Sequence, residues 1–260
     1  MIAFDGLEAL LGLTSGILWA VFLVFLRMGA LVSVMPAFGT SAVPMRIKLG
    51  VALALTAIVT PAVYIPPEFS QYSLDTLVLA ALTETVNGLL LGIGLRLILI
   101  ALQTAGSMAA QATSLAQILG AAGVDPMPAM GQVLVVGAYA LAMILGLHVR
   151  VAEMLILSYS VLPMGQFPDP SSVSEWGVSQ VAKAFAMGFT LAAPFIIVSV
   201  LYNLTLGIIN RAMPQLMVVF VGAPVITMGG LFLLMLLAPL MLGLWSEALF
   251  SFIANPFKGP

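Results

Sequence analysis

The stretch TAGSMAAQATSLAQILGAAGVDPMPAMGQ, Thr104–Gln132, lies between two long apolar blocks, Leu77–Leu102 and Val133–Leu147. It is too polar to cross a membrane, because Gln111 and Gln117 would face lipid without partners. It contains only one charged residue, which is unusual for a solvated loop. Irregular backbone at membrane depth is tolerated only where it is buried in protein or lines a water-filled cavity. We therefore predict that this stretch is irregular, protein-enclosed, mobile and functional; the alternative is a cytoplasmic loop with no special role.

The composition predicts an integral membrane protein. Of 260 residues, 62% are hydrophobic and 7% are charged, whereas soluble domains carry about 25% charged residues. With no cysteine, disulfides and thiolate metal sites are excluded, and no cofactor is expected. A net charge of −2 without a basic patch argues against nucleic-acid binding. The single histidine, His148, has no residue to orient it, so we interpret it as a satisfied structural side chain.

Six apolar segments are each long enough to cross about 30 Å of hydrocarbon as a helix. They are 16–35, 47–65, 77–102, 133–162, 184–209 and 216–244. The predicted fold class is all-α, an integral membrane protein of kinked helical hairpins. Gly146 is expected to bend its segment, and Pro194, Pro224 and Pro239 to kink or break theirs.

The charged residues of the loops predict an orientation. The N-terminal segment carries only acids, the next loop carries Arg46 and Lys48, and the loop near residue 210 carries Arg211. The positive-inside rule therefore places the N-terminus outside and the loops with arginine inside. Lys183 and Lys258 oppose this pattern.

Two stripes of polar and small residues recur every four positions and so share one helix face. One is Glu84, Gly88, Gly92 and Arg96; the other is Ser199, Asn203 and Gly207. Buried charges need partners and glycines let backbones approach, so we predict that both stripes and Arg27 pack against other subunits. The alternative is packing inside a monomeric six-helix bundle. Arg150 and Glu153 are spaced to pair on one face.

Sequence motifs for nucleotide binding, metalloprotease chemistry or a serine nucleophile are absent, so an enzyme is not expected. Two non-enzymatic functions are then left: a subunit of a conduit for unfolded export substrates, and, as the alternative, a secondary transporter for a small solute. It would need charges converging at the midplane, such as Arg96 with Glu84 or Glu153. Co-purification separates the two, since a transporter purifies alone or as a small homo-oligomer.

Three clusters resemble the FliR/SctT family of type III protein-export gate subunits. They are Arg27-Met-Gly-Ala with Met35-Pro36-Ala-Phe-Gly39, Val43-Pro44 and Arg46; Ser107–Pro126; and Gly207–Gln215 followed by Val219-Phe-Val-Gly-Ala-Pro224. The third is the most specific, because an N-R-x-x-P-Q turn before V-F-x-G-x-P is unusual between two apolar blocks.

The resemblance implies a single export-gate domain over residues 1–260, with a FliP-like part, 1–180, followed by a FliQ-like hairpin, 181–260. It implies a pore-forming subunit in the bacterial inner membrane, within the flagellar basal body, that passes unfolded flagellar proteins. Its partners would be FliP and FliQ subunits, with FlhB and FlhA joining the gate. An injectisome gate subunit is the alternative within the family. A hairpin tip at Asn210, Arg211, Pro214 and Gln215 would face the cytoplasmic entrance near FlhB.

The resemblance also implies that the loop Ser107–Asp125 plugs the closed pore. In this interpretation Gly106, Gly120 and Gly123 are hinges, and Met108, Leu115 and Ile118 form an apolar seal. Gln111, Ser114 and Gln117 would exchange protein partners for water on opening.

Overall fold

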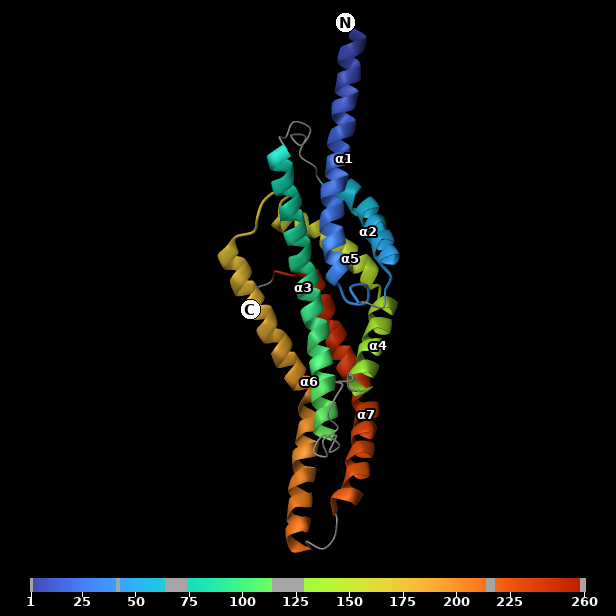
Figure 1. The fold of residues 1–260 in the computed structure, drawn as a ribbon, viewed down its shortest axis with the longest axis vertical. Coiled ribbons are helices and arrows are strands. Elements are labelled where there is room, and N and C mark those ends of the chain that lie inside the picture. The colour runs from blue at the N-terminus through green and yellow to red at the C-terminus, as the bar shows by residue number, and fades with distance from the viewer. Residues whose placement is uncertain (1, 41–42, 64–73, 114–128, 214–217, 258–260) are drawn as a thin grey trace. The chain divides into compact units, whose positions relative to one another are not determined.

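The computed structural model describes residues 2–40, 43–63, 74–113, 129–213 and 218–257. Its helices are α1 (Ile2–Val34), α2 (Met45–Val59), the short 3-10 helix η1 (Thr60–Ala62), α3 (Leu74–Thr113), α4 (Ala129–Ile144), α5 (Leu147–Val161), α6 (Pro170–Ala212) and α7 (Val218–Ala254) (Figure 1). No strand occurs within these ranges. The all-α prediction is therefore confirmed.

Five helices are long and apolar enough to cross a membrane, and the bent pair α4–α5 makes a sixth candidate. The six predicted segments are thus confirmed, although several helices run further than their apolar cores. Gly146 separates α4 from α5 with φ 81°, a left-handed conformation that glycine adopts without steric cost. The predicted bend at this glycine is confirmed.

The prolines inside α6 and α7 do not break them. Pro194 lies within α6, and Pro224 and Pro239 lie within α7, each in an unbroken helix. Helix breaking at these positions, one of the two predicted outcomes, is therefore wrong.

The end of α1 is set by local sequence. The residue before a proline is disfavoured in the α conformation, and α1 ends at Val34, just before Met35-Pro36. Ala37 then adopts φ 69°, and the Gly39 N–H donates to the Met35 carbonyl at 2.7 Å. A Cβ at Gly39 would lie 2.7 Å from the Val34 carbonyl carbon, so only glycine fits this turn.

The start of α6 is also set by the local sequence. Pro170 occupies the first helical position, where no donor is lost, and the Asp169 carboxylate accepts from the Ser172 N–H at 2.8 Å. Residues 170–180 are therefore helical, and α6 begins well before the predicted apolar segment 184–209.

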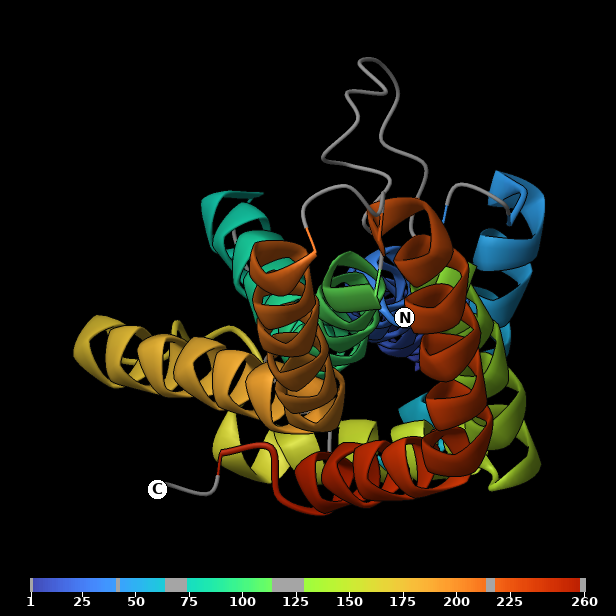
Figure 2. The same cartoon turned by 90° about the horizontal axis from the view of Figure 1, so that it is seen from below.

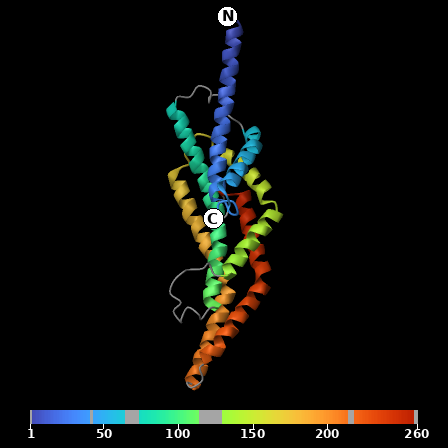
Figure 3. The ribbon, with the colours of Figure 1, turned by 45° about the vertical axis from the view of Figure 1, so that its right-hand side comes forward.

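The chain forms two compact units. The first contains Met1–Arg96, Gly146–Gly177 and Phe250–Pro260, and in it α2 packs against α1 and α5. Figure 3 shows α1 and α2 side by side in two shades of blue. The second contains Leu97–Leu145 and Val178–Leu249.

In the second unit the end of α3 is the central element. Figure 2 shows this green segment between the orange α6 and the red α7. The Trp245 indole of α7 is fully buried and donates to the Ile98 carbonyl of α3 at 3.0 Å. Gly188 of α6 lets the same helix approach, because a Cβ there would lie 3.0 Å from the Ala101 carbonyl oxygen.

Candidate functional site

In the first unit α1 and α3 cross at the glycines of the predicted stripe. A Cβ added at Gly88 would lie 2.3 Å from the Arg27 carbonyl oxygen, and one at Gly92 would lie 3.1 Å from that of Leu31. Contact at this distance is possible only where the residue has no side chain. The four-residue spacing of Gly88 and Gly92, a GxxxG motif, therefore serves the packing of two helices of the same chain.

This close approach places a guanidinium directly against a carboxylate. Arg27 Nε lies 2.7 Å from Glu84 Oε2, and Nη2 donates to Oε1 at 3.0 Å, which is the bidentate geometry that arginine prefers. Both side chains are fully buried, and this is the one ion pair among the described residues. An isolated buried charge would cost several kcal/mol, so each partner requires the other.

The remaining arginine donors reach α5 and the segment after it. Nη1 donates to the Ser158 hydroxyl at 3.1 Å, and Nη2 also donates to the Leu162 carbonyl at 2.9 Å. The guanidinium carbon lies 3.7 Å from the centre of the Tyr159 ring, and the Gly165 N–H donates to Glu84 Oε1 at 3.3 Å. This buried charge cluster therefore fixes α1, α3 and α5 to one another.

In the second unit α3 and α4 form a hairpin around the stretch singled out in the sequence. A Cβ at Gly106 would lie 2.4 Å from the Gly131 Cα, so the two helices touch backbone to backbone. Further along, the Thr113 hydroxyl lies 3.9 Å from the Met130 sulfur. The last residue of α3 and the first turn of α4 are therefore neighbours.

Helices α6 and α7 close on the same end of α3. The Ser199 hydroxyl of α6 donates to the Ala112 carbonyl. Gly230 of α7 faces Thr113, whose methyl group would lie 2.5 Å from an added Cβ. Four helices therefore frame the point where the chain leaves α3.

The structure corrects part of the predicted plug. Helix α3 continues through Thr113 and α4 begins at Ala129, so both ends of the stretch Thr104–Gln132 are helical rather than irregular. Gly106, a predicted hinge, lies inside α3 and packs against Gly131. Ser107 and Met108 are half-buried in α3 and Gln111 is exposed on it. The other predicted plug residues lie outside the described residues: Ser114, Leu115, Gln117, Ile118, Gly120, Gly123 and Asp125.

The predicted subunit-packing residues fall into two groups. Arg27, Glu84, Gly88 and Gly92 pack inside their own chain, which corrects their assignment to an interface and matches the intramolecular alternative. Ser199 is also buried, by its bond to α3. Arg96, Asn203 and Gly207 are exposed.

The remaining predicted charged and hairpin-tip residues that the structure describes lie at the surface. Arg150 and Glu153 are exposed and form no ion pair with each other, so their predicted pairing is wrong. His148 is exposed at the start of α5 rather than packed. At the predicted hairpin tip, Asn210 and Arg211 are exposed at the end of α6, while Pro214 and Gln215 lie outside the described residues.

Sequence reasoning missed Ser158, Tyr159 and Gly165, the partners that complete the buried charge cluster. Nothing in their spacing signals a role, because they meet Arg27 and Glu84 only through the fold. Among the described residues no three His, Cys, Asp or Glu side chains are grouped to hold a metal ion.

Five long apolar helices and the bent pair α4–α5 are typical of a multi-pass membrane protein. The family model described as bacterial export proteins, family 1, matches residues 18–252. The flagellar biosynthetic protein FliR of Caulobacter vibrioides is 33% identical over 216 residues, which cover 82% of this chain and 86% of that protein. FliR of Escherichia coli is 30% identical over 237 residues (88% of each chain), and FliR of Aquifex aeolicus is 29% identical over 252 (92% and 95%). The chain belongs to this family of bacterial export proteins, which confirms the resemblance found in its sequence motifs.

Proposed function

We propose that the chain is a non-enzymatic, pore-forming subunit of a flagellar type III protein-export gate through which unfolded flagellar proteins pass. The observation that carries this proposal is the similarity to proteins named FliR, which covers more than four fifths of both chains in the three relatives that are at least 30% identical. The flagellar names favour this use over an injectisome.

The gate would close with the segment between α3 and α4. Gly106 against Gly131 and Thr113 against Met130 hold the two flanking helices together, which supports a loop that leaves and returns at one place. In this proposal Leu115 and Ile118 seal the channel together with Met108, while Gln111, Ser114 and Gln117 exchange partners for water. The hinges are Gly120 and Gly123.

The assembly is part of the same proposal. The chain would lie in the bacterial inner membrane within a gate that contains FliP and FliQ subunits, with FlhB and FlhA attached. Its residues 1–180 would act as a FliP-like part and 181–260 as a FliQ-like hairpin. The exposed apolar face of α6, which includes Phe185, Phe189 and Leu204, supports cover by neighbouring helices or by lipid.

The transporter alternative gains no support from the charges it requires. The Glu84 carboxylate is already paired with Arg27. Arg96 and Glu153 are exposed and have no ion-pair partner among the described residues. These groups do not converge on a site for a small solute.

Deletion of Leu115–Gly123 tests the plug. Because Thr113 and Met130 are neighbours, the remaining residues Ser114 and Val124–Pro128 are long enough to join α3 to α4, since helix connections commonly take 2–8 residues. We expect the gate to assemble and to conduct ions in planar bilayers, where the unaltered gate is closed. This deletion spares α3, which removal of Gln111–Gln117 would shorten.

The control replaces Leu115–Gly123 with glycine and serine at unchanged length. If the apolar residues form the seal, this variant also leaks. An unaltered ion conductance in both variants would refute the plug while leaving the family assignment intact. Co-purification without any FliP- or FliQ-like chain would refute the gate itself.

A further inference from the structure

Helix α5 carries its acidic and basic side chains at one end. His148, Arg150 and Glu153 are exposed in its first two turns, whereas the rest of the helix up to Val161 has no acidic or basic residue. With 15 residues it is about 22 Å long, too short to cross about 30 Å of hydrocarbon alone. A short helix with exposed charges at one end and apolar residues beyond is suited to the boundary between water and lipid.

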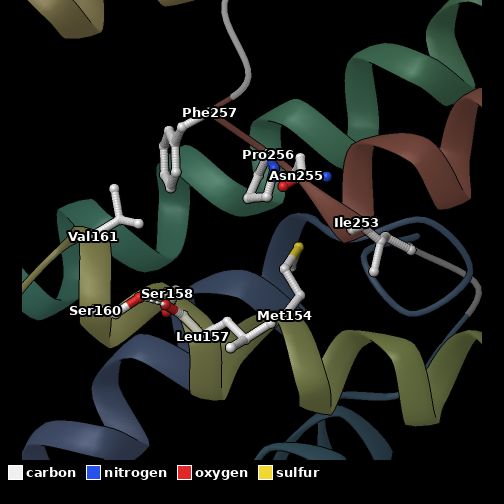
Figure 4. Close-up of a pocket in the computed structure, with 10 residues that line it drawn as sticks. Met154, Leu157, Ser158, Ser160, Val161, Ile253, Asn255, Pro256 and Phe257 are labelled. Atoms are coloured by element: carbon white, nitrogen blue, oxygen red, sulfur yellow. Dashed lines mark hydrogen bonds between the residues drawn. The ribbon is translucent and has the colours of Figure 1, made fainter.

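A groove runs between α5 and the C-terminal end of α7. Its volume is about 540 Å³, within the range of sites that hold small molecules. Figure 4 shows Met154 and Leu157 from α5 on one side, with Ile253, Pro256 and Phe257 on the other. Most of the wall is therefore apolar.

The segment after α7 is held in place as a wall of this groove. The Trp176 indole donates to the Pro256 carbonyl at 2.7 Å, and its ring lies 5.9 Å from the Phe257 ring. Phe257 and Val161 also line an adjoining pocket of about 270 Å³, which contains Asp169. The two cavities thus meet at the C-terminal end of α5.

The two ends of this path differ in charge. Arg150 lies one turn before Met154 on α5, and its guanidinium carbon is 6.0 Å from the ring of Phe250 on α7. It is exposed and forms no ion pair among the described residues. The carboxylate of Asp169 stands at the opposite end, so an anionic group is favoured near Arg150 and repelled near Asp169.

We propose that the groove binds one acyl chain of an anionic phospholipid whose phosphate contacts Arg150. Val161 lies eleven residues after Arg150 on the helix, about 16 Å at 1.5 Å per residue. That length matches one acyl chain, because two chains end to end fill a hydrocarbon core of about 30 Å. Ser158, Ser160 and Asn255 add polar groups to an otherwise apolar lining.

The test uses the complex purified with the full chain and placed in nanodiscs of phosphatidylglycerol and phosphatidylcholine. Native mass spectrometry then counts the lipids that stay bound. We expect Arg150→Gln to lower the retained phosphatidylglycerol about fivefold relative to phosphatidylcholine, since one basic residue near anionic lipid contributes about that factor. Arg96→Gln is the matched control, because Arg96 is also exposed but lies outside the groove, and it should change nothing.

Met154→Trp fills the groove and should remove the bound lipid of either kind. A photoreactive phenylalanine at Leu157 should form adducts with lipid. An unchanged lipid preference in Arg150→Gln, or an equal loss in Arg96→Gln, would overturn the headgroup assignment. Adducts of the Leu157 probe with protein alone would show that a polypeptide occupies the groove, and would overturn the proposal even if Met154→Trp does not fold.

Discussion

Two stripes with the same four-residue spacing are packed differently in this molecule. The inner stripe, on α3, is Glu84, Gly88, Gly92 and Arg96, and the outer stripe, on α6, is Ser199, Asn203 and Gly207. A Cβ at Gly88, in the stripe of α3, would lie 2.3 Å from the backbone of α1, whereas a Cβ at Gly207, in the stripe of α6, would meet nothing within 4 Å. Glu84 is fully buried in an ion pair, while Asn203 is exposed. A periodic polar and small-residue face therefore predicts close packing, but the spacing alone does not say whether the partner is the same chain.

The largest loss of stability is expected from replacing Glu84, the buried charged residue of the inner stripe. Glu84→Ala leaves the buried guanidinium of Arg27 without its carboxylate, and breaking one partner of a buried pair costs about 3–5 kcal/mol. We expect low accumulation in membranes and early unfolding in a detergent titration of the purified complex.

Two variants separate this effect from a general intolerance of substitution. Glu153→Ala removes an exposed carboxylate without an ion pair among the described residues, and it should change stability by less than about 0.5 kcal/mol. The double variant Arg27→Met with Glu84→Leu should recover much of the loss, because apolar replacements of a buried pair are often tolerated. Equal stability of Glu84→Ala and Glu153→Ala would contradict the role given to the buried charge cluster.

An intermediate effect is expected from adding one methyl group to each stripe. Gly88→Ala forces α1 and α3 apart, and overpacking of this kind typically costs about 1–3 kcal/mol. Gly207→Ala meets no atom of its own chain, and replacing glycine inside a helix favours folding by about 0.5–1 kcal/mol. Thermal unfolding of the two variants should therefore shift in opposite directions.

The variants Gly88→Ala and Gly207→Ala also reveal what covers the outer stripe. If another subunit packs on Gly207, its alanine variant folds normally but co-purifies with less of that subunit. If lipid covers it, the amount of co-purified subunit is unchanged. A loss of stability for Gly207→Ala equal to that for Gly88→Ala would mean that the two stripes do not differ as the structure indicates.

The sequence was sufficient for the helices but not for their ends. Apolar length predicted six membrane segments, and a lone glycine predicted the break at Gly146, because both signals are local. The end of α3 at Thr113 was missed, since Gly106 looks unfavourable for a helix until α4 packs against it at Gly131. Tertiary contact overrides weak local preference at such positions.

The partners within the buried charge cluster could not be predicted from the sequence either. Arg27 and Glu84 were recognised as needing partners, because charge in an apolar segment is costly. Their pairing joins positions 57 residues apart, and Ser158 joins from 131 residues away, so no spacing rule connects them. The plug residues from Ser114 to Asp125 stay predictions.

The smallest effect concerns the start of α6, the helix that carries the outer stripe, because this end rests on local capping at an exposed site. Hydrogen bonds from the Ser171 hydroxyl and from the Ser172 N–H and hydroxyl lower the pKa of Asp169 below its usual value. The ionised carboxylate therefore stabilises the folded cap at pH values above the usual carboxyl pKa, and this contribution is lost as the pH falls through the lowered pKa. The protection of the first-turn amides, measured as hydrogen exchange relative to the intrinsic rate at each pH, should fall on acidification in the unaltered chain, whereas Asp169→Asn, which keeps a capping oxygen but cannot titrate, should show no such step. Asp169→Ala should show low protection of these amides at every pH; high protection in this variant would mean that packing, and not the cap, holds the beginning of α6.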